Sequence, residues 1–267
     1  MKKTRKQLEI KLLIISYLLI MLILPILALF NETSIAFPED FYKKAFNPIT
    51  LSTYWITLSN GFITALINGF FGLIVAWILV KYDFWGKKII DSTIDLPFAL
   101  PTAVAGLTLS TVYSDQYPIG SFLNNFGIEV VYNNTGVSLA MLFVSFPFVV
   151  RTVQPVLEEL EQDIEEVSWS LGGSYIETFF RIILPLIFPA LITGIILAFS
   201  RAIGEYGSIV IIASNIPFRD LVASVLIFQS LEQYDKTGAT IIGTIVLLTS
   251  LILLLSINAF QNWKKLK

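Results

Sequence analysis

The stretch that decides the fold is Glu166-Val167-Ser168-Trp169-Ser170-Leu171-Gly172, followed after nine residues by Ile182-Ile183-Leu184-Pro185. It carries charges and adjacent glycines, although apolar runs of membrane-spanning length lie on both of its sides. The pattern predicts a short helix–turn–helix held at a membrane surface.

The local signals within this stretch set its expected shape. A helix is predicted over residues 155–171, and Gly172 with Gly173 can end it because glycine accepts positive φ. Ser174 and Glu177 have the capping-box spacing that starts a second helix. The apolar residues of that helix fall on one stripe: Ile176, Phe179, Phe180 and Ile183. Pro185 stops or kinks the helix. An ordinary amphipathic linker lying in the interface is the alternative interpretation.

The stretch resembles the Glu-Ala-Ala…Gly…Ile-x-Leu-Pro signature of ABC importer permeases, both in its residues and in two intervals between them. Glu166 precedes Gly172 by six residues, and Gly172 precedes Ile182 by ten. The chain departs from the signature where Val167 and Ser168 replace two alanines. The resemblance implies that this segment docks into a groove on an ATPase subunit. The residues that would make the contact are Glu166, Val167, Ser168, Leu171, Gly172, Ile182, Leu184 and Pro185.

The composition is that of a polytopic membrane protein. Of 267 residues, 55% are hydrophobic and 14% are charged, and the mean hydropathy is +0.75. A soluble domain of this length would carry more charge. The net charge of −2 gives no electrostatic footprint for nucleic acid.

Apolar runs predict an all-α bundle of six membrane-spanning helices in one domain covering residues 1–267. A run of nineteen uncharged residues at 12–30 extends about 28 Å as a helix, which is one bilayer core. A cleaved signal peptide is the alternative for this first run, but no A-x-A site follows it. The expected spans are 12–30, 54–80, 94–113, 136–156, 186–204 and 237–260, with an inside loop at 158–184.

The distribution of Lys and Arg orients this bundle. With six spans, the inside segments hold thirteen Lys and Arg residues and the outside loops hold four. Since orientation follows Lys and Arg rather than acidic residues, both termini are expected on the cytoplasmic or stromal side. The acidic loop at 158–184 then lies on the side where ATP is available.

Polar residues inside the predicted spans are the candidates for a transport pathway. Asn60, Thr64, Asn68 and Gly72 share one face of span two, where the alternatives are helix packing and a pathway lining. Arg201 and Glu205, four residues apart, are either a self-neutralising pair or a functional one. The pathway candidates are Arg201, Glu205, Thr102, Ser200 and Asn68.

Two further segments resemble the sulfate and molybdate permeases. One runs from Asp95 to Gly106 and contains Pro97 and Pro101, which break span three near its inner start. In a membrane, such a break must be buried in protein or line a cavity. The other segment is Ser200-Arg201-Ala202-Ile203-Gly204-Glu205-Tyr206-Gly207.

The chemistry of an enzyme is absent from the sequence. The chain has no Cys and no His, so thiol nucleophiles, Ser/His pairs and the usual zinc motifs are excluded. It also lacks the P-loop sequence G-x-x-x-x-G-K-[ST]. We expect no cofactor and no metal site, and we expect ATP to be hydrolysed on a partner.

The chain as a whole resembles the sulfate/thiosulfate group of ABC importer permeases, which have the MetI-like fold, and it is most similar to one of the two paired permease subunits of that group. The resemblance implies two ATPase subunits, a homologous second permease subunit and a soluble sulfate-binding protein as partners. A molybdate/tungstate permease, which would form a homodimer, is the alternative within the class. An ion-coupled secondary carrier and a non-transporting membrane scaffold are alternatives from other classes. The expected location is an algal plastid (chloroplast) envelope membrane, with a bacterial inner membrane as the alternative.

Overall fold

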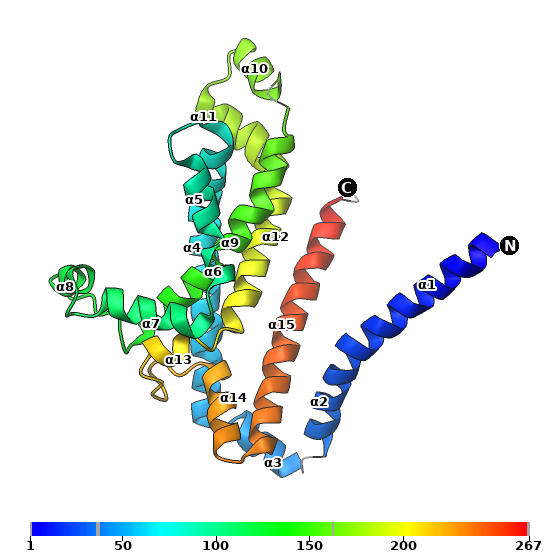
Figure 1. The fold of residues 1–267 in the computed structure, drawn as a ribbon, viewed down its shortest axis with the longest axis vertical. Helices are drawn as coiled ribbons and strands as arrows, with labels where there is room; N and C mark the ends of the chain where they lie inside the picture. The colour runs from blue at the N-terminus through cyan, green and yellow to red at the C-terminus, as the bar shows by residue number, and fades with distance from the viewer. Residues whose placement is uncertain (1, 36–37, 162, 266–267) are drawn as a thin grey trace.

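The body of the protein is a bundle of long helices packed around α4 (Pro48–Lys81), α9 (Asn134–Glu159) and α12 (Leu184–Ile203). A computed structural model describes residues 2–35, 38–161 and 163–265, and these residues form helices and connecting turns without a strand. Figure 1 shows the three central helices side by side, with α15 (Lys236–Lys265) beside them. The all-α membrane bundle predicted from the apolar runs is confirmed.

The polar face of span two is a packing face. A Cβ on Gly72 would lie 2.8 Å from the side chain of Val149, so only glycine allows this approach of α4 to α9. The Asn60 side chain lies at the same seam, where its Nδ2 donates to Oδ1 of Asn134 at 2.8 Å. These contacts bury the apolar cluster that α4, α9 and α12 share.

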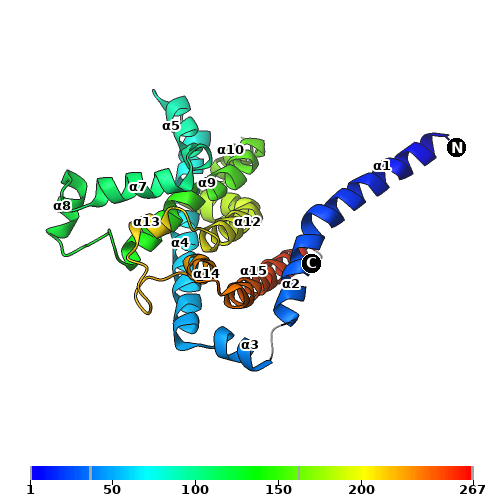
Figure 2. The same ribbon diagram turned by 60° about the horizontal axis from the view of Figure 1, so that its bottom comes forward.

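The third expected span is not one helix. The structure divides it between α6 (Leu96–Ala99) and α7 (Thr102–Tyr113), and α5 (Lys87–Ile94) ends where the expected span begins. The break comes at Pro101, which has no N–H to donate and pushes Leu100 into an extended conformation. Because of this break, α7 leaves the direction of the bundle and extends to the side, as Figure 2 shows.

The described residues contain five helices that are long and apolar enough to cross a membrane. They are Ile10–Ser34, Pro48–Lys81, Asn134–Glu159, Tyr175–Ile203 and Lys236–Leu255. Each contains or overlaps one of the expected spans, and the broken third span is the one without such a helix.

The N-terminal helix stands apart from the bundle. It comprises α1 (Lys2–Leu18), the π-helical turn η1 (Leu19–Ile23) and α2 (Leu24–Ser34). Its contact with the rest of the protein is near its end, where the hydroxyl of Thr33 lies 2.8 Å from that of Thr244 in α15. In Figures 1 and 2 α1 diverges from α15 and extends away from the central helices.

Short helices α3 (Pro38–Ala45) and α14 (Ala223–Glu232) lie at the end of the bundle where α15 begins. Two further short helices lie beside the broken segment: α8 (Pro118–Asn124) packs against α7, and α13 (Ile209–Ile212) packs against α7 and α9. The opposite end carries α10 (Asp163–Ser170) and α11 (Tyr175–Thr178), followed by the π-helical turn η2 (Phe179–Ile183). Figure 1 shows α3 and α10 at opposite ends, and both the start of α1 and the end of α15 lie on the side towards α10.

Candidate functional site

Residues 160–161 and 163–184, which we call the helical loop, form a projecting helix–turn–helix at one end of the bundle (Figure 1). The expected single helix over 155–171 is wrong, because α9 ends at Glu159 and α10 begins at Asp163. Carboxylates one turn apart disfavour a continuous helix. The break places Asp163, Glu165 and Glu166 in the first turn of α10, where negative charge is favourable.

Gly172 ends α10 as the sequence predicts. Its φ is +90°, which an L side chain rarely adopts. The N–H of Gly173 donates to the carbonyl of Ser168 at 3.0 Å, and the N–H of Gly172 donates to the carbonyl of Trp169 at 2.9 Å. This pair of bonds is the Schellman motif, so the turn has a defined geometry.

Ser174 starts the second helix with the predicted capping box. Its hydroxyl accepts from the N–H of Glu177 at 3.2 Å, and the Glu177 carboxylate accepts from the N–H of Ser174 at 3.3 Å. The helix then runs on through η2 into α12. Pro185 therefore does not stop it; since proline cannot donate to the preceding turn, the π-helical turn at 179–183 absorbs the irregularity.

The predicted apolar stripe of the second helix is divided between two environments. Phe179 packs edge-on against Trp77 of α4 with ring centroids 5.1 Å apart, and Ile183 is buried beside them. Ile176 and Phe180 stay exposed at 72% and 61%. The outward half of the stripe is available to another molecule.

The helical loop is also tied to the bundle by charge. Lys81, at the end of α4, forms an ion pair with Glu165 of α10, and its ammonium lies 5.6 Å from the ring centroid of Trp77. Both partners of the ion pair are largely buried. The ion pair therefore joins α10 to the end of α4.

The eight residues expected to contact the ATPase subunit do not share one environment. Glu166, Val167, Leu171 and Gly172 are exposed on the helical loop, whereas Ser168 is buried and Ile182 and Leu184 are half-buried. Pro185 is exposed in the first turn of α12. The sequence missed Tyr175, which is exposed at 76% beside Trp169, with ring centroids 4.8 Å apart.

A second group of polar residues lies where α12 ends. Arg201 Nη2 is 2.8 Å from Glu205 Oε2, and the Glu205 side chain is only 2% exposed. The other carboxylate oxygen accepts from the N–H and the hydroxyl of Ser208, at 2.9 and 2.8 Å. The buried charge of Glu205 is therefore compensated by one cation and two hydrogen bonds.

The start of α7 rests on this same turn. A Cβ on Gly207 would lie 2.1 Å from the hydroxyl oxygen of Thr102, so the approach depends on glycine. We call Thr102 together with residues 204–208 the junction. Arg201 keeps 30% of its side chain exposed beside the junction, and Ser200, half-buried, precedes it on α12. The structure thus pairs Arg201 with Glu205 and places Thr102 against the turn that follows, while Ser200 is only their neighbour in the chain.

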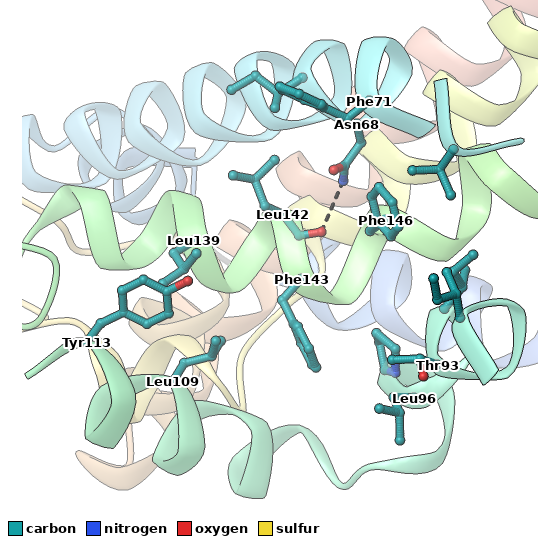
Figure 3. A pocket seen from close by; sticks show the side chains of 15 residues that line it. Asn68, Phe71, Thr93, Leu96, Leu109, Tyr113, Leu139, Leu142, Phe143 and Phe146 are labelled. Carbon is teal, nitrogen blue, oxygen red and sulfur yellow. Dashed lines mark hydrogen bonds between the residues drawn. The ribbon is translucent and has the colours of Figure 1, made fainter. Parts of the chain in front are cut away.

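Asn68 lies elsewhere, in the seam between α4 and α9. Its Nδ2 donates to the carbonyl of Leu142 at 3.1 Å and to the hydroxyl of Ser145 at 2.8 Å. Figure 3 shows this side chain directed at Leu142. The neighbouring pocket of about 670 Å³ is lined mainly by apolar side chains, among them Phe71, Phe143 and Phe146. Asn68 therefore bonds across the seam between α4 and α9 and also lines this pocket, and it lies apart from the other four pathway candidates.

The described residues hold no group of three or more His, Cys, Asp or Glu side chains that could bind a metal ion.

The sequence pattern also missed Ser208 and Thr178, because a hydroxyl in an apolar segment gives no periodic signal. The only signal in the sequence was that Ser208 lies near Glu205 and that Thr178 directly follows Glu177 of the predicted capping box.

Comparisons with known proteins agree on one class. The model of the family described as "Binding-protein-dependent transport system inner membrane component" matches residues 68–264. The probable sulfate transport system permease protein cysT of Chlorokybus atmophyticus is 60% identical over 252 residues, which cover 94% of this chain and 88% of that protein. The sulfate transport system permease protein CysT of Synechocystis sp. is 53% identical over 249 residues, which cover 93% and 87%.

Two solved structures share the fold. One is a bacterial ABC transporter involved in the import of the acidic polysaccharide alginate, with a TM-score of 0.78 at 16% identity, covering 98% of this chain and 96% of that chain. The other is an amino acid ABC transporter, with a TM-score of 0.54 at 20% identity, covering 81% and 94%.

Proposed function

Because this chain belongs to the family of binding-protein-dependent transport system inner membrane components, we propose that it is the permease subunit of an ATP-driven sulfate importer. The observation that carries this proposal is the 60% identity to a probable sulfate transport system permease over 94% of the chain. The family places the chain among transport subunits, and ATP hydrolysis belongs to its partners. An ion-coupled carrier or a passive scaffold does not account for that identity.

Sulfate and thiosulfate are the proposed substrates, with molybdate and tungstate as the alternative. The relatives that match most of the chain are named as sulfate transport permeases. A doubly charged anion needs compensation to cross an apolar bundle. The Arg201 side chain is 30% exposed beside the junction, and the guanidinium N–H groups that do not bond to Glu205 are donors for such an anion. Arg201, Thr102 and Ser200 are therefore the proposed pathway residues, and Glu205 holds Arg201 in place.

The helical loop is the proposed contact for the ATPase subunit. Three properties support this assignment: it projects from one end of the bundle, its turn has a fixed geometry, and it exposes apolar side chains that another protein would bury. Glu166, Val167, Leu171 and Gly172 contribute directly. Ser168 shapes the contact from beneath, and Ile182, Leu184 and Pro185 lead the chain back into α12.

The proposed assembly contains two ATPase subunits, a homologous second permease subunit and a soluble sulfate-binding protein. ATPase and binding-protein partners follow from the family, and the pairing of unlike permease subunits is the finer proposal. Residues 1–267 act as one transmembrane domain, with both termini on the ATPase side. Since the similar permeases come from algae and cyanobacteria, the proposed location is a plastid envelope membrane, with a bacterial inner membrane as the alternative.

Sulfate uptake in cells that lack their own sulfate importer tests the substrate. The chain is expressed with its ATPase, second permease and binding-protein partners, and uptake of labelled sulfate is measured against competing anions. We expect thiosulfate to compete with sulfate and equimolar molybdate to leave uptake unchanged. Competition by molybdate at lower concentration than thiosulfate would replace this proposal with the molybdate alternative.

A further inference from the structure

The guanidinium of Arg151 joins α9 to the segment that precedes the broken helix. Its Nε donates to Asp95 Oδ1 at 2.8 Å and its Nη2 donates to Asp95 Oδ2 at 2.7 Å. This two-bond geometry fixes the orientation of both side chains, which a lysine at the same position would not do.

Asp91, one turn earlier on α5, also binds Arg151. Its carboxylate accepts from Nη1 at 2.6 Å, and its backbone carbonyl accepts from Nη2 at 2.7 Å. Nη1 further donates to Oε1 of Gln154 at 2.8 Å. The Arg151 side chain is 29% exposed, so these charge-assisted bonds are partly shielded from water.

The cluster around Arg151 lies directly before the interruption of the third span. Asp95 is the residue between α5 and α6, and Pro101 interrupts the chain between α6 and α7. Across that interruption no continuous ladder of helical hydrogen bonds fixes where α7 begins. The bonds of Arg151, with the edge-on contact of Phe98 and Phe148 at 5.2 Å, hold α6 on α9 instead.

Arg151 is also linked, along α9, to the helical loop. It lies eight residues before Glu159, where α9 ends and the helical loop begins. Its neighbour Gln154 donates to Glu158 at 3.1 Å, one turn nearer the loop. On the far side, α7 rests on the junction through Thr102 and Gly207. A continuous series of contacts therefore leads from the helical loop to the proposed pathway.

We propose that Arg151 is a positioning residue for transport: it transmits movement of the helical loop through α9 to α6 and α7, and so to the junction. Arg151 does not touch the anion in this mechanism. It ensures that α9 and α7 move together when the ATPase subunits close. This inference rests on the proposed function, because it assumes that ATP hydrolysis at the helical loop drives transport through the bundle.

A residue that only stabilises the fold and a residue that couples two sites give different results on mutation. Loss of a stabilising contact reduces the amount of assembled complex, and the remaining complex moves the normal amount of sulfate per ATP hydrolysed. Loss of a coupling contact leaves the complex assembled and hydrolysing ATP, while less sulfate moves per ATP. The decisive quantity is therefore the ratio of sulfate transported to ATP hydrolysed.

The test uses the full complex in proteoliposomes with Arg151→Gln and Asp95→Asn in this chain. The matched control is Lys87→Gln, which removes a cation on α5, the helix that carries Asp91; the partner of that cation, Asp83, is 99% exposed. Since coupling between sites corresponds to about 5–150-fold effects, we expect the sulfate-to-ATP ratio to fall at least about fivefold in both variants. The control keeps the wild-type ratio.

The charge exchange Arg151→Asp with Asp95→Arg supplies the second arm. It reverses the ion pair and leaves Asp91 beside the new arginine, so we expect it to recover much of the ratio lost in Arg151→Gln. A wild-type ratio in Arg151→Gln would overturn the inference. So would failure of every variant except the control to assemble, because Arg151 would then be a structural residue only. If the wild-type complex itself moves no sulfate, the proposed function fails instead.

Discussion

The hydroxyl of Ser168 lies 2.8 Å from the hydroxyl of Thr178, and this bond joins α10 to α11 within the helical loop. Both side chains are buried. The bond explains why serine is accommodated where the resembled signature has alanine: the position faces the second helix of the loop rather than the outside. The neighbouring Val167 is exposed, so of the two replacements it is the one whose side chain is accessible to another protein.

Replacing Ser168 with alanine is expected to be mild. Thr178 keeps its hydrogen bond to the carbonyl of Ser174 at 2.9 Å, so the loss is about 1 kcal/mol or less. Ser168→Leu should be severe, because its side chain would displace the turn at Gly173. Sulfate uptake and co-purification of the ATPase subunits measure both. Equal loss in the two variants would show that the hydroxyl bond, rather than the space, controls the loop.

Gly172 tests the geometry of the turn. At φ +90° a β-branched side chain is strained by roughly 1–2 kcal/mol, although the surrounding space is open. Gly172→Val should therefore weaken association with the ATPase subunit and reduce uptake. Gly172→Asn is the matched control, because asparagine accepts positive φ more readily. The expectation fails if valine and asparagine reduce uptake by the same factor.

The pair of Arg201 and Glu205 requires a double substitution. Removing Arg201 alone leaves a buried carboxylate without its cation, which costs about 3–5 kcal/mol and disturbs assembly. Arg201→Met with Glu205→Gln keeps the volume and removes both charges. We expect this neutral pair to assemble in normal amounts and to lose most sulfate uptake. Normal uptake in the assembled neutral pair would make the ion pair structural.

Gly207 tests the contact between α7 and the turn after α12. Gly207→Ala places a Cβ within 2.1 Å of the Thr102 hydroxyl oxygen, so α7 must move and uptake should fall. Adding Thr102→Ala removes that oxygen and should restore part of the uptake. No recovery in the double variant would indicate that another contact, rather than the one with Thr102, determines the position of α7.

The sequence predicted those parts of the fold that depend on local signals. The cap at Ser174, the positive φ at Gly172 and the break near Pro101 each follow from one or two residues, and all three appear in the structure. The apolar runs likewise predicted the long helices, because a bilayer core sets their length.

Features that depend on tertiary contacts could not be predicted in this way. Nothing in the sequence near Arg151 shows that Asp91 and Asp95, about sixty residues earlier, are its partners. Asn68 was a pathway candidate because an amide in a span is costly. Its partners on α9 compensate that cost, and they are known only once α4 and α9 are packed.

Transport of sulfate driven by ATP tests the central claim most directly. The complex of this chain with its ATPase, second permease and binding-protein partners is reconstituted in proteoliposomes, with ATP supplied on the ATPase side. We expect labelled sulfate to accumulate only when both ATP and the binding protein are present, and vanadate to stop it. Accumulation driven by a proton gradient without ATP would contradict the assignment of this chain as the permease of an ATP-driven sulfate importer.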